Sequence, residues 1–186
     1  IRVLEGGDPQ ADATVQQARQ ALRQAMAPIV KRFADQTDGS MLQAHFHLPN
    51  SRSLVRIWRD GWNANKNGKK VDISDDLSSF RRTVLQVNQA PYAPISGIEL
   101  GRGGFAIRGL CAISDGNGRH LGSVEVLLPF SSATAQLARQ ADAGLAVYLD
   151  AAHLNVATKL ADPAKYPLLD EAYVLCAMDQ AEVVEP

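Results

Sequence analysis

The sequence predicts an α+β domain in which a long N-terminal helix precedes a five-stranded antiparallel sheet. Apolar residues recur every three or four positions from residue 8 to 35, the period of a helix. Residues 41–48 alternate between apolar and polar side chains, the period of a strand. Asp115-Gly116-Asn117-Gly118 separates two strand-like runs and is a strong hairpin signal. Antiparallel strands with helices packed to one side define the α+β class.

The elements follow in a clear order along the chain. Asp8 and Pro9 suit the start of the long helix, as its cap and its first helical residue. Two strands and a second helix follow, then three strands, a third helix and a short αβ segment. Their expected ranges are 41–48, 53–58, 75–88, 95–100, 105–114, 121–128, 131–144, 145–149 and 173–178. We therefore divide the chain into an N-terminal helix (1–40), a core (41–144) and a C-terminal appendage with its tail (145–186).

The composition excludes several classes of protein. The 186 residues carry a net charge of −1, without the basic excess that nucleic-acid binding needs, so we expect no nucleic-acid partner. No apolar run approaches the roughly 18 residues that span a bilayer. Because the chain begins at Ile1, we expect a segment of a longer protein whose membrane anchors lie elsewhere. The two cysteines, Cys111 and Cys176, fit no metal or haem motif, and we expect two buried thiols on strands.

Two histidines are the candidates for metal or catalytic chemistry. His45 and His47 lie two apart on one strand face, so both imidazoles could reach one ion. A zinc site needs three or four ligands, and Glu99 is the only third ligand that the sequence suggests. No nucleophile motif accompanies the pair. We therefore expect no metal, no cofactor and no catalysis. The alternative is a small metal-dependent or hydrolytic enzyme that uses His45 and His47.

A cationic and aromatic group of residues is the candidate for ligand binding. Arg52, Arg56 and Trp58 fall within one short segment, and Arg108 lies amid apolar residues of a later strand. A charged side chain in such a place needs a partner. For Arg108 that partner is an internal carboxylate such as Glu99 or a bound anion, and arginine suits bidentate capture of a carboxylate. Both interpretations stay open at this point.

Four blocks of the sequence resemble a known family. Residues 45–58 are similar to the FHLPPxRSxLRxW stretch of Cache sensory domains, which occur in methyl-accepting chemotaxis proteins and sensor histidine kinases. Residues 75–81 resemble the DDLSxFR helix start of that family. Residues 96–109 resemble its GxExGRGGxAIRG strand pair, and residues 121–126 its GSVEV strand. The order and spacing of the four blocks agree.

The resemblance implies a PAS-like fold and a role in signalling. It implies a small-molecule pocket on the sheet, in a periplasmic domain that membrane segments anchor, with a homodimer in the receptor. We therefore expect a chemoreceptor sensor that binds a small anionic ligand, carboxylate or amino-acid-like, and that is not an enzyme. The residues expected to bind this ligand are His45, Arg52, Arg56, Trp58, Glu99 and Arg108. A third possibility is an interaction domain whose pocket is filled by its own side chains.

Overall fold

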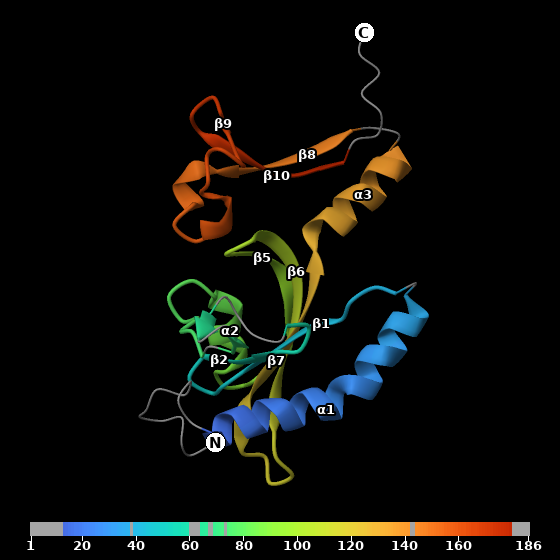
Figure 1. Cartoon of the computed structure of the whole chain (residues 1–186), viewed down its shortest axis with the longest axis vertical. Coiled ribbons are helices and arrows are strands. Elements are labelled where there is room, and N and C mark those ends of the chain that lie inside the picture. The colour runs from blue at the N-terminus through green and yellow to red at the C-terminus, as the bar shows by residue number, and fades with distance from the viewer. Residues whose placement is uncertain are drawn as a thin grey trace. The chain divides into compact units, whose positions relative to one another are not determined.

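The computed structural model describes residues 13–37, 39–59, 64–66, 69–72, 74–141 and 144–179 (Figure 1). The chain divides into two compact units. The first contains residues 1–95 and 109–127, and the second contains residues 96–108 and 128–186. The expected division at residues 40 and 144 stays a prediction.

A five-stranded antiparallel sheet is the main element of the fold, so the predicted α+β, PAS-like class is confirmed. The strand order is β2-β1-β7-β6-β5, which places β1 between β2 and β7. The strands are β1 (Gln43–His47), β2 (Ser53–Arg56), β5 (Ile95–Gly101), β6 (Gly104–Ser114) and β7 (His120–Pro129). The predicted hairpin joins β6 to β7, and the Asp115 carboxylate accepts hydrogen bonds from the backbone of Asn117 and Arg119 in its turn. A separate hairpin pairs β3 (Ala64–Lys66) with β4 (Lys69–Val71).

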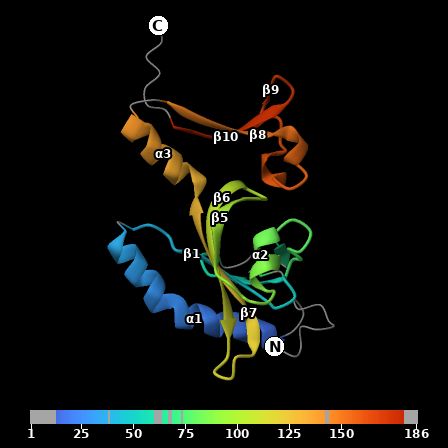
Figure 2. The same ribbon diagram turned by 180° about the vertical axis from the view of Figure 1, so that it is seen from behind.

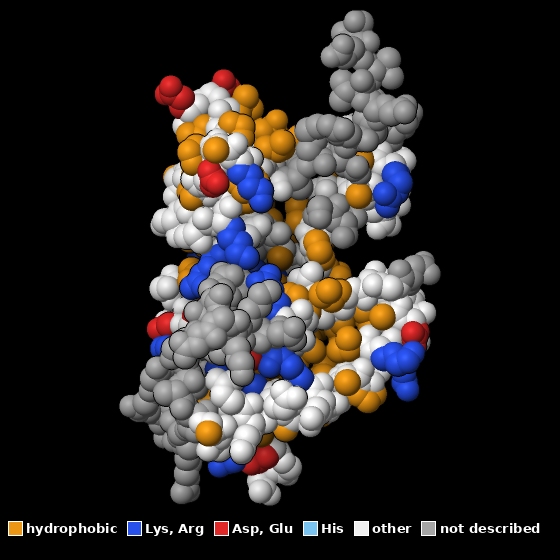
Figure 3. Space-filling model, in the orientation of Figure 1, with side chains coloured by type: hydrophobic (Ala, Val, Ile, Leu, Met, Phe, Trp, Pro, Cys, Tyr) orange, Lys and Arg blue, Asp and Glu red, His pale blue; other side chains and the backbone are white. Residues whose placement is uncertain are grey.

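In the long helix α1 (Ala13–Gln36), two arginine side chains bind other parts of the first unit. Arg19 is fully buried, and it donates hydrogen bonds to the Leu54 carbonyl and to Ser74. Arg23 forms an ion pair with Asp72 at 2.8 Å. The expected apolar face is wrong in this respect, because Arg19 is buried and Ile29 is 54% exposed. Hydrophobic side chains accordingly reach the surface beside α1 (Figure 3).

The second helix is shorter than predicted. It begins at Arg82 and ends at Val87 as α2, whereas the sequence suggested a helix from residue 75. Residues 75–81 instead follow the chain at 51–53: the Ser53 amide donates to the Asp75 carbonyl, and the Leu77 amide donates to the Ser51 carbonyl. Because these backbone groups pair outside a helix, the segment stays irregular. Leu77 then packs with Val84, Val87 and Leu110 in the core of this unit.

The second unit contains the C-terminal elements. Helix α3 (Phe130–Ala141) packs against β8 (Leu145–Asp150) and β10 (Tyr173–Asp179), which form a three-stranded sheet with β9 (Leu168–Leu169), as the view from behind also shows (Figure 2). Two short 3-10 helices, Ala151–His153 and Thr158–Leu160, lie between β8 and β9. The buried core of this unit consists of Leu149, Ala157, Leu160 and Val174.

The expectation that both thiols are buried is wrong. Cys111 is exposed on β6, and Cys176 is half-buried on β10. Alternation along β6 directs Cys111 away from the core that contains its neighbour Leu110. Burial raises the pKa of the Cys176 thiol, so this group stays protonated near neutral pH.

Candidate functional site

Strand pairing brings two rows of polar side chains together on one face of the sheet. In the first row, His45 on β1 is directly opposite Arg56 on β2 and Glu125 on β7. In the second row, His47 is opposite Ser53 and Ser123 on the same two strands. The register between β1 and β2 shifts by one residue between these rows. This irregularity lets Ser53 and Arg56, which differ in parity along β2, serve the same face.

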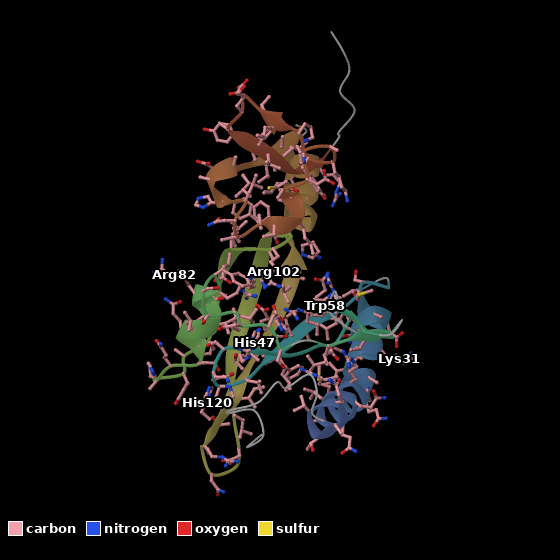
Figure 4. All side chains as sticks on the ribbon, turned by 60° about the vertical axis from the view of Figure 1, so that its left-hand side comes forward. Lys31, His47, Trp58, Arg82, Arg102 and His120 are labelled. Atoms are coloured by element: carbon pink, nitrogen blue, oxygen red, sulfur yellow. The ribbon has the colours of Figure 1, made fainter. Side chains whose placement is uncertain are left out.

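This polar face is inside the molecule. His45 and His47 are each 2% exposed, and Glu125 is fully buried. Figure 4 shows His47 within the sheet, whereas Lys31 and Arg82 lie at the periphery. The sequence predicted a strand with one apolar and one polar side, but both sides of β1 are covered. Buried polar groups are costly unless they are paired, so the contacts of this cluster decide its stability.

The imidazoles use both of their nitrogen atoms. His45 Nδ1 lies 2.9 Å from Glu125 Oε1, and His45 Nε2 lies 2.8 Å from Ser53 Oγ. His47 Nε2 lies 3.0 Å from His45 Nδ1 and 3.4 Å from Glu125 Oε1, and His47 Nδ1 lies 3.0 Å from Ser123 Oγ. One nitrogen of each ring thus points to a common centre with Glu125, and the other points to a serine hydroxyl.

Two arginines border the cluster. Arg81 is the residue immediately before α2, and it donates hydrogen bonds to both carboxylate oxygens of Glu125. Arg56 donates to Ser53 Oγ at 2.9 Å and forms an ion pair with Asp75, with nitrogen-to-oxygen distances of 3.2–3.4 Å. The irregular segment 75–81 before α2 therefore contributes one residue to each ion pair, Asp75 to the first and Arg81 to the second. These two ion pairs link the segment to the sheet.

The pKa values follow from this burial and pairing. Burial, then the neighbouring His47 and the Arg56 charge, holds the pKa of His45 well below its usual value. Burial also lowers the pKa of His47. Burial opposes ionisation of Glu125, but the hydrogen bond from His45 and the charge of Arg81 help to outweigh it, so the pKa of Glu125 lies well below its usual range. At neutral pH the cluster therefore contains neutral imidazoles and two arginine–carboxylate ion pairs, Arg56 with Asp75 and Arg81 with Glu125.

The predicted binding residues separate into two groups. His45, Arg56 and Trp58 lie together in the first unit, where Trp58 packs edge-on against His45 at a ring separation of 6.4 Å. Trp58 follows the end of β2 in a turn, so it lies outside the strand, which the sequence predicted to extend over 53–58. Arg52 also lies in this unit and pairs through its backbone with Asp76.

The other two predicted residues belong to the second unit. Arg108 Nε lies 3.6 Å from Glu99 Oε2, and both side chains are largely buried. The internal carboxylate considered for Arg108 is therefore present. Arg108 also lies against Gly101, where a β-carbon would collide with its guanidinium group.

Sequence reasoning missed two central residues, Glu125 and Arg81. Glu99 was the suggested third ligand for the histidine pair, but Glu125 occupies that place. A signal was available, since Glu125 is the acidic residue within the apolar run 121–128, and a charge there demands a partner. The register between β1 and β7, which puts Glu125 opposite His45, could not be read from the two strands alone.

Comparison with known families decides the broader identity. A family model described as the double sensory domain of two-component sensor kinases, dCache_3, matches residues 10–173. The chain belongs to this family. The predicted resemblance to Cache sensory domains is confirmed. No curated protein and no solved structure matches the chain significantly.

Membership of the dCache_3 family sets the general role. Domains of this kind are extracytoplasmic parts of sensor proteins, and they bind ligands without turning them over. Among the described residues of this dCache_3 domain, no helix is both long and apolar enough to cross a membrane.

Proposed function

We propose that this dCache_3 domain is the periplasmic sensor of a transmembrane chemoreceptor or sensor kinase and that it binds a small anion, a carboxylate or an amino acid. The single observation that supports an anion most is the environment of Arg56. This guanidinium is 7% exposed, and its internal partner Asp75 lies in the irregular segment before α2, at 3.2–3.4 Å. A ligand carboxylate can replace Asp75 with the same bidentate geometry.

This exchange also supplies a signal. A ligand reports its presence only if it prefers one of two arrangements of the protein. Release of Asp75 from Arg56 would free one end of the segment that carries Arg81, and Arg81 binds Glu125 on β7. Occupancy would therefore be transmitted to the central strands. Trp58 would cover the apolar part of the ligand, and His45 would add a hydrogen bond through Ser53.

The remaining predicted residues keep their proposed roles. Arg52 would contribute charge near the same segment. Glu99 and Arg108 would repeat the arginine–carboxylate arrangement in the second unit, where a second anion could exchange with Glu99. In the full-length receptor we expect a homodimer anchored by membrane segments.

A thermal-shift screen of amino acids, organic acids and inorganic anions comes first, because a ligand that binds only the folded form must raise its stability. Calorimetry on the compound found then tests Arg56→Ala and Arg108→Ala. Removal of either arginine should cost about 2–5 kcal/mol of binding free energy, which lowers the affinity for the anion by about 30-fold or more. Arg82→Ala is the control, since Arg82 is exposed on α2.

A second variant separates the exchange from simple damage to the fold. Asp75→Asn removes the competing charge and should increase the affinity for the anion, whereas Asp76→Asn, at an exposed neighbour, should not. Unchanged affinity in Arg56→Ala and in Arg108→Ala would refute the assignment of these arginines.

A further inference from the structure

We propose that His45, His47 and Glu125 form a binding site for one divalent transition-metal ion of the Zn²⁺ class. The three side chains come from alternate positions of β1 and from the facing position of β7, and their ligand atoms converge on one point. This site goes beyond the proposed anion sensor, and each can exist without the other.

The spacing of the three atoms fits a metal ion. His45 Nδ1, His47 Nε2 and Glu125 Oε1 are separated by 2.9, 3.0 and 3.4 Å. An ion about 2.1 Å from each, the usual length of zinc–nitrogen and zinc–oxygen bonds, would subtend angles of roughly 90–110° between them. These angles lie between those of octahedral and tetrahedral coordination. Two imidazoles and one carboxylate satisfy three positions and leave at least one open, a donor set that suits zinc and its neighbours.

The atoms of His45, His47 and Glu125 that would not bind the ion are hydrogen-bonded, as they are in known metal ligands. Ligating histidines normally use the second ring nitrogen in a hydrogen bond, and ligating carboxylates are hydrogen-bonded in turn. Here the outer nitrogens of His45 and His47 lie 2.8 Å from Ser53 Oγ and 3.0 Å from Ser123 Oγ. Arg81 donates hydrogen bonds to both oxygens of Glu125, at 2.5 Å to Oε2 and at 3.2 Å to Oε1. These contacts fix the orientation of all three ligands before an ion arrives.

The protons of the cluster can rearrange to admit the ion. Without a metal, His45 Nδ1–H donates to Glu125 Oε1, and its other nitrogen accepts from Ser53. With a metal, the neutral ring moves its proton to Nε2, donates to Ser53 and presents its Nδ1 lone pair to the ion. His47 presents its Nε2 in both cases, because its Nδ1–H donates to Ser123. Binding therefore needs a change of tautomer and no change in the charge of either ring.

The charges around the site indicate which further ligand a bound metal ion would have. Arg56 and Arg81 oppose a cation, whereas Asp75 and Glu125 balance them, so the cluster is neutral before an ion binds. A divalent ion would add two charges to a buried place, and its open position would therefore take hydroxide or a carboxylate. The ligands are at most 2% exposed, which suits a bound ion in slow exchange better than turnover of a substrate.

The test uses the whole 186-residue chain, stripped with a chelator and dialysed into metal-free buffer. Co²⁺ and Zn²⁺ are then titrated, with bound metal per chain measured by elemental analysis and Co²⁺ geometry by its visible absorption. We expect one ion per chain, a Co²⁺ spectrum with nitrogen and oxygen ligands, and a rise in melting temperature. His47→Gln and Glu125→Gln should each lower the affinity at least tenfold. His153→Gln, at an exposed histidine outside the cluster, should bind as the parent does.

Three outcomes would overturn the site: less than a stoichiometric ion in the parent chain, unchanged affinity in both cluster variants, or an equal loss in His153→Gln. Circular dichroism on each variant shows whether it folds. If Glu125→Gln does not fold, the parent stoichiometry and the His47→Gln affinity still decide. Loss of anion binding in Arg56→Ala with normal Co²⁺ binding would leave the metal site in place, so the two proposals fail separately.

Discussion

The ion pair between Arg81 and Glu125 offers the sharpest test of the buried cluster. We expect Arg81→Met to destabilise the metal-free protein strongly at pH 8. Methionine fills the space of the arginine stem, so the change removes the charge and its hydrogen bonds with little loss of packing. Glu125 would then keep its charge with no guanidinium beside its Oε2.

The magnitude follows from the burial of both partners. The Arg81 side chain is 5% exposed and that of Glu125 is fully buried. Removal of one partner of such a pair costs about 3–5 kcal/mol of unfolding free energy. His45 or His47 can restore part of this by taking up a proton, because each unit of pKa shift is worth about 1.4 kcal/mol. The loss in Arg81→Met should therefore be smaller at pH 6 than at pH 8.

Urea unfolding with a chelator present, followed by circular dichroism, measures the effect. Arg82→Met is the matched control, since its side chain is exposed one residue further along α2. The double variant Arg81→Met/Glu125→Gln should recover much of the loss, because it also removes the buried charge. A cost for Arg81→Met within about 1 kcal/mol of the control would refute the reasoning about this pair.

Three further predictions concern the same sheet face. The metal-free protein should lose stability as the pH falls from 7 to 5: burial lowers the histidine pKa values in the folded state, so the unfolded chain takes up protons that the folded chain does not. In the folded state the charges of Arg56 and Arg81 disfavour protonation of the histidines, and the charge of Glu125 favours it. A urea midpoint that does not change between pH 7 and pH 5 would contradict the prediction. Gly122→Ala should destabilise the fold, because Gly122 has φ +133° and a β-carbon would collide with the His47 carbonyl; Gly109→Ala, which meets open space, is the control for the melting temperature. In calorimetry at equal ionic strength, the affinity for Co²⁺ should be higher in acetate than in perchlorate. Equal affinities would show that the bound ion has no open coordination position that a carboxylate can fill.

Local patterns in the sequence were sufficient for most of the fold. The alternation in 41–48 and the glycine-rich hairpin at 115–118 predicted β1, β6 and β7 because both signals depend on neighbouring residues. The segment 75–81 was misread as helical because its backbone pairs with residues 51–53, far along the chain. Tertiary pairing of this kind overrides local propensity.

The candidate site was only half visible in the sequence. His45, Arg56 and Trp58 were identified because residues 45–58 resemble the Cache motif and because a charged side chain such as Arg56 needs a partner. Glu125 and Arg81 were missed because their roles depend on strand register and on how the chain returns before α2. Register is set by pairing across the sheet, and a one-residue shift would turn Glu125 to the other face.

The charge balance of the cluster connects its two proposed occupants. When the histidines are neutral, the charges of Arg56 and Arg81 are balanced by those of Asp75 and Glu125. The cluster therefore has no excess charge that a bound cation or anion would have to neutralise. A divalent ion shifts this balance to positive and favours a carboxylate near it. A carboxylate that displaces Asp75 from Arg56 shifts it to negative and favours the ion. Each occupant must therefore strengthen the other by the same factor, since coupling between two binding sites is reciprocal.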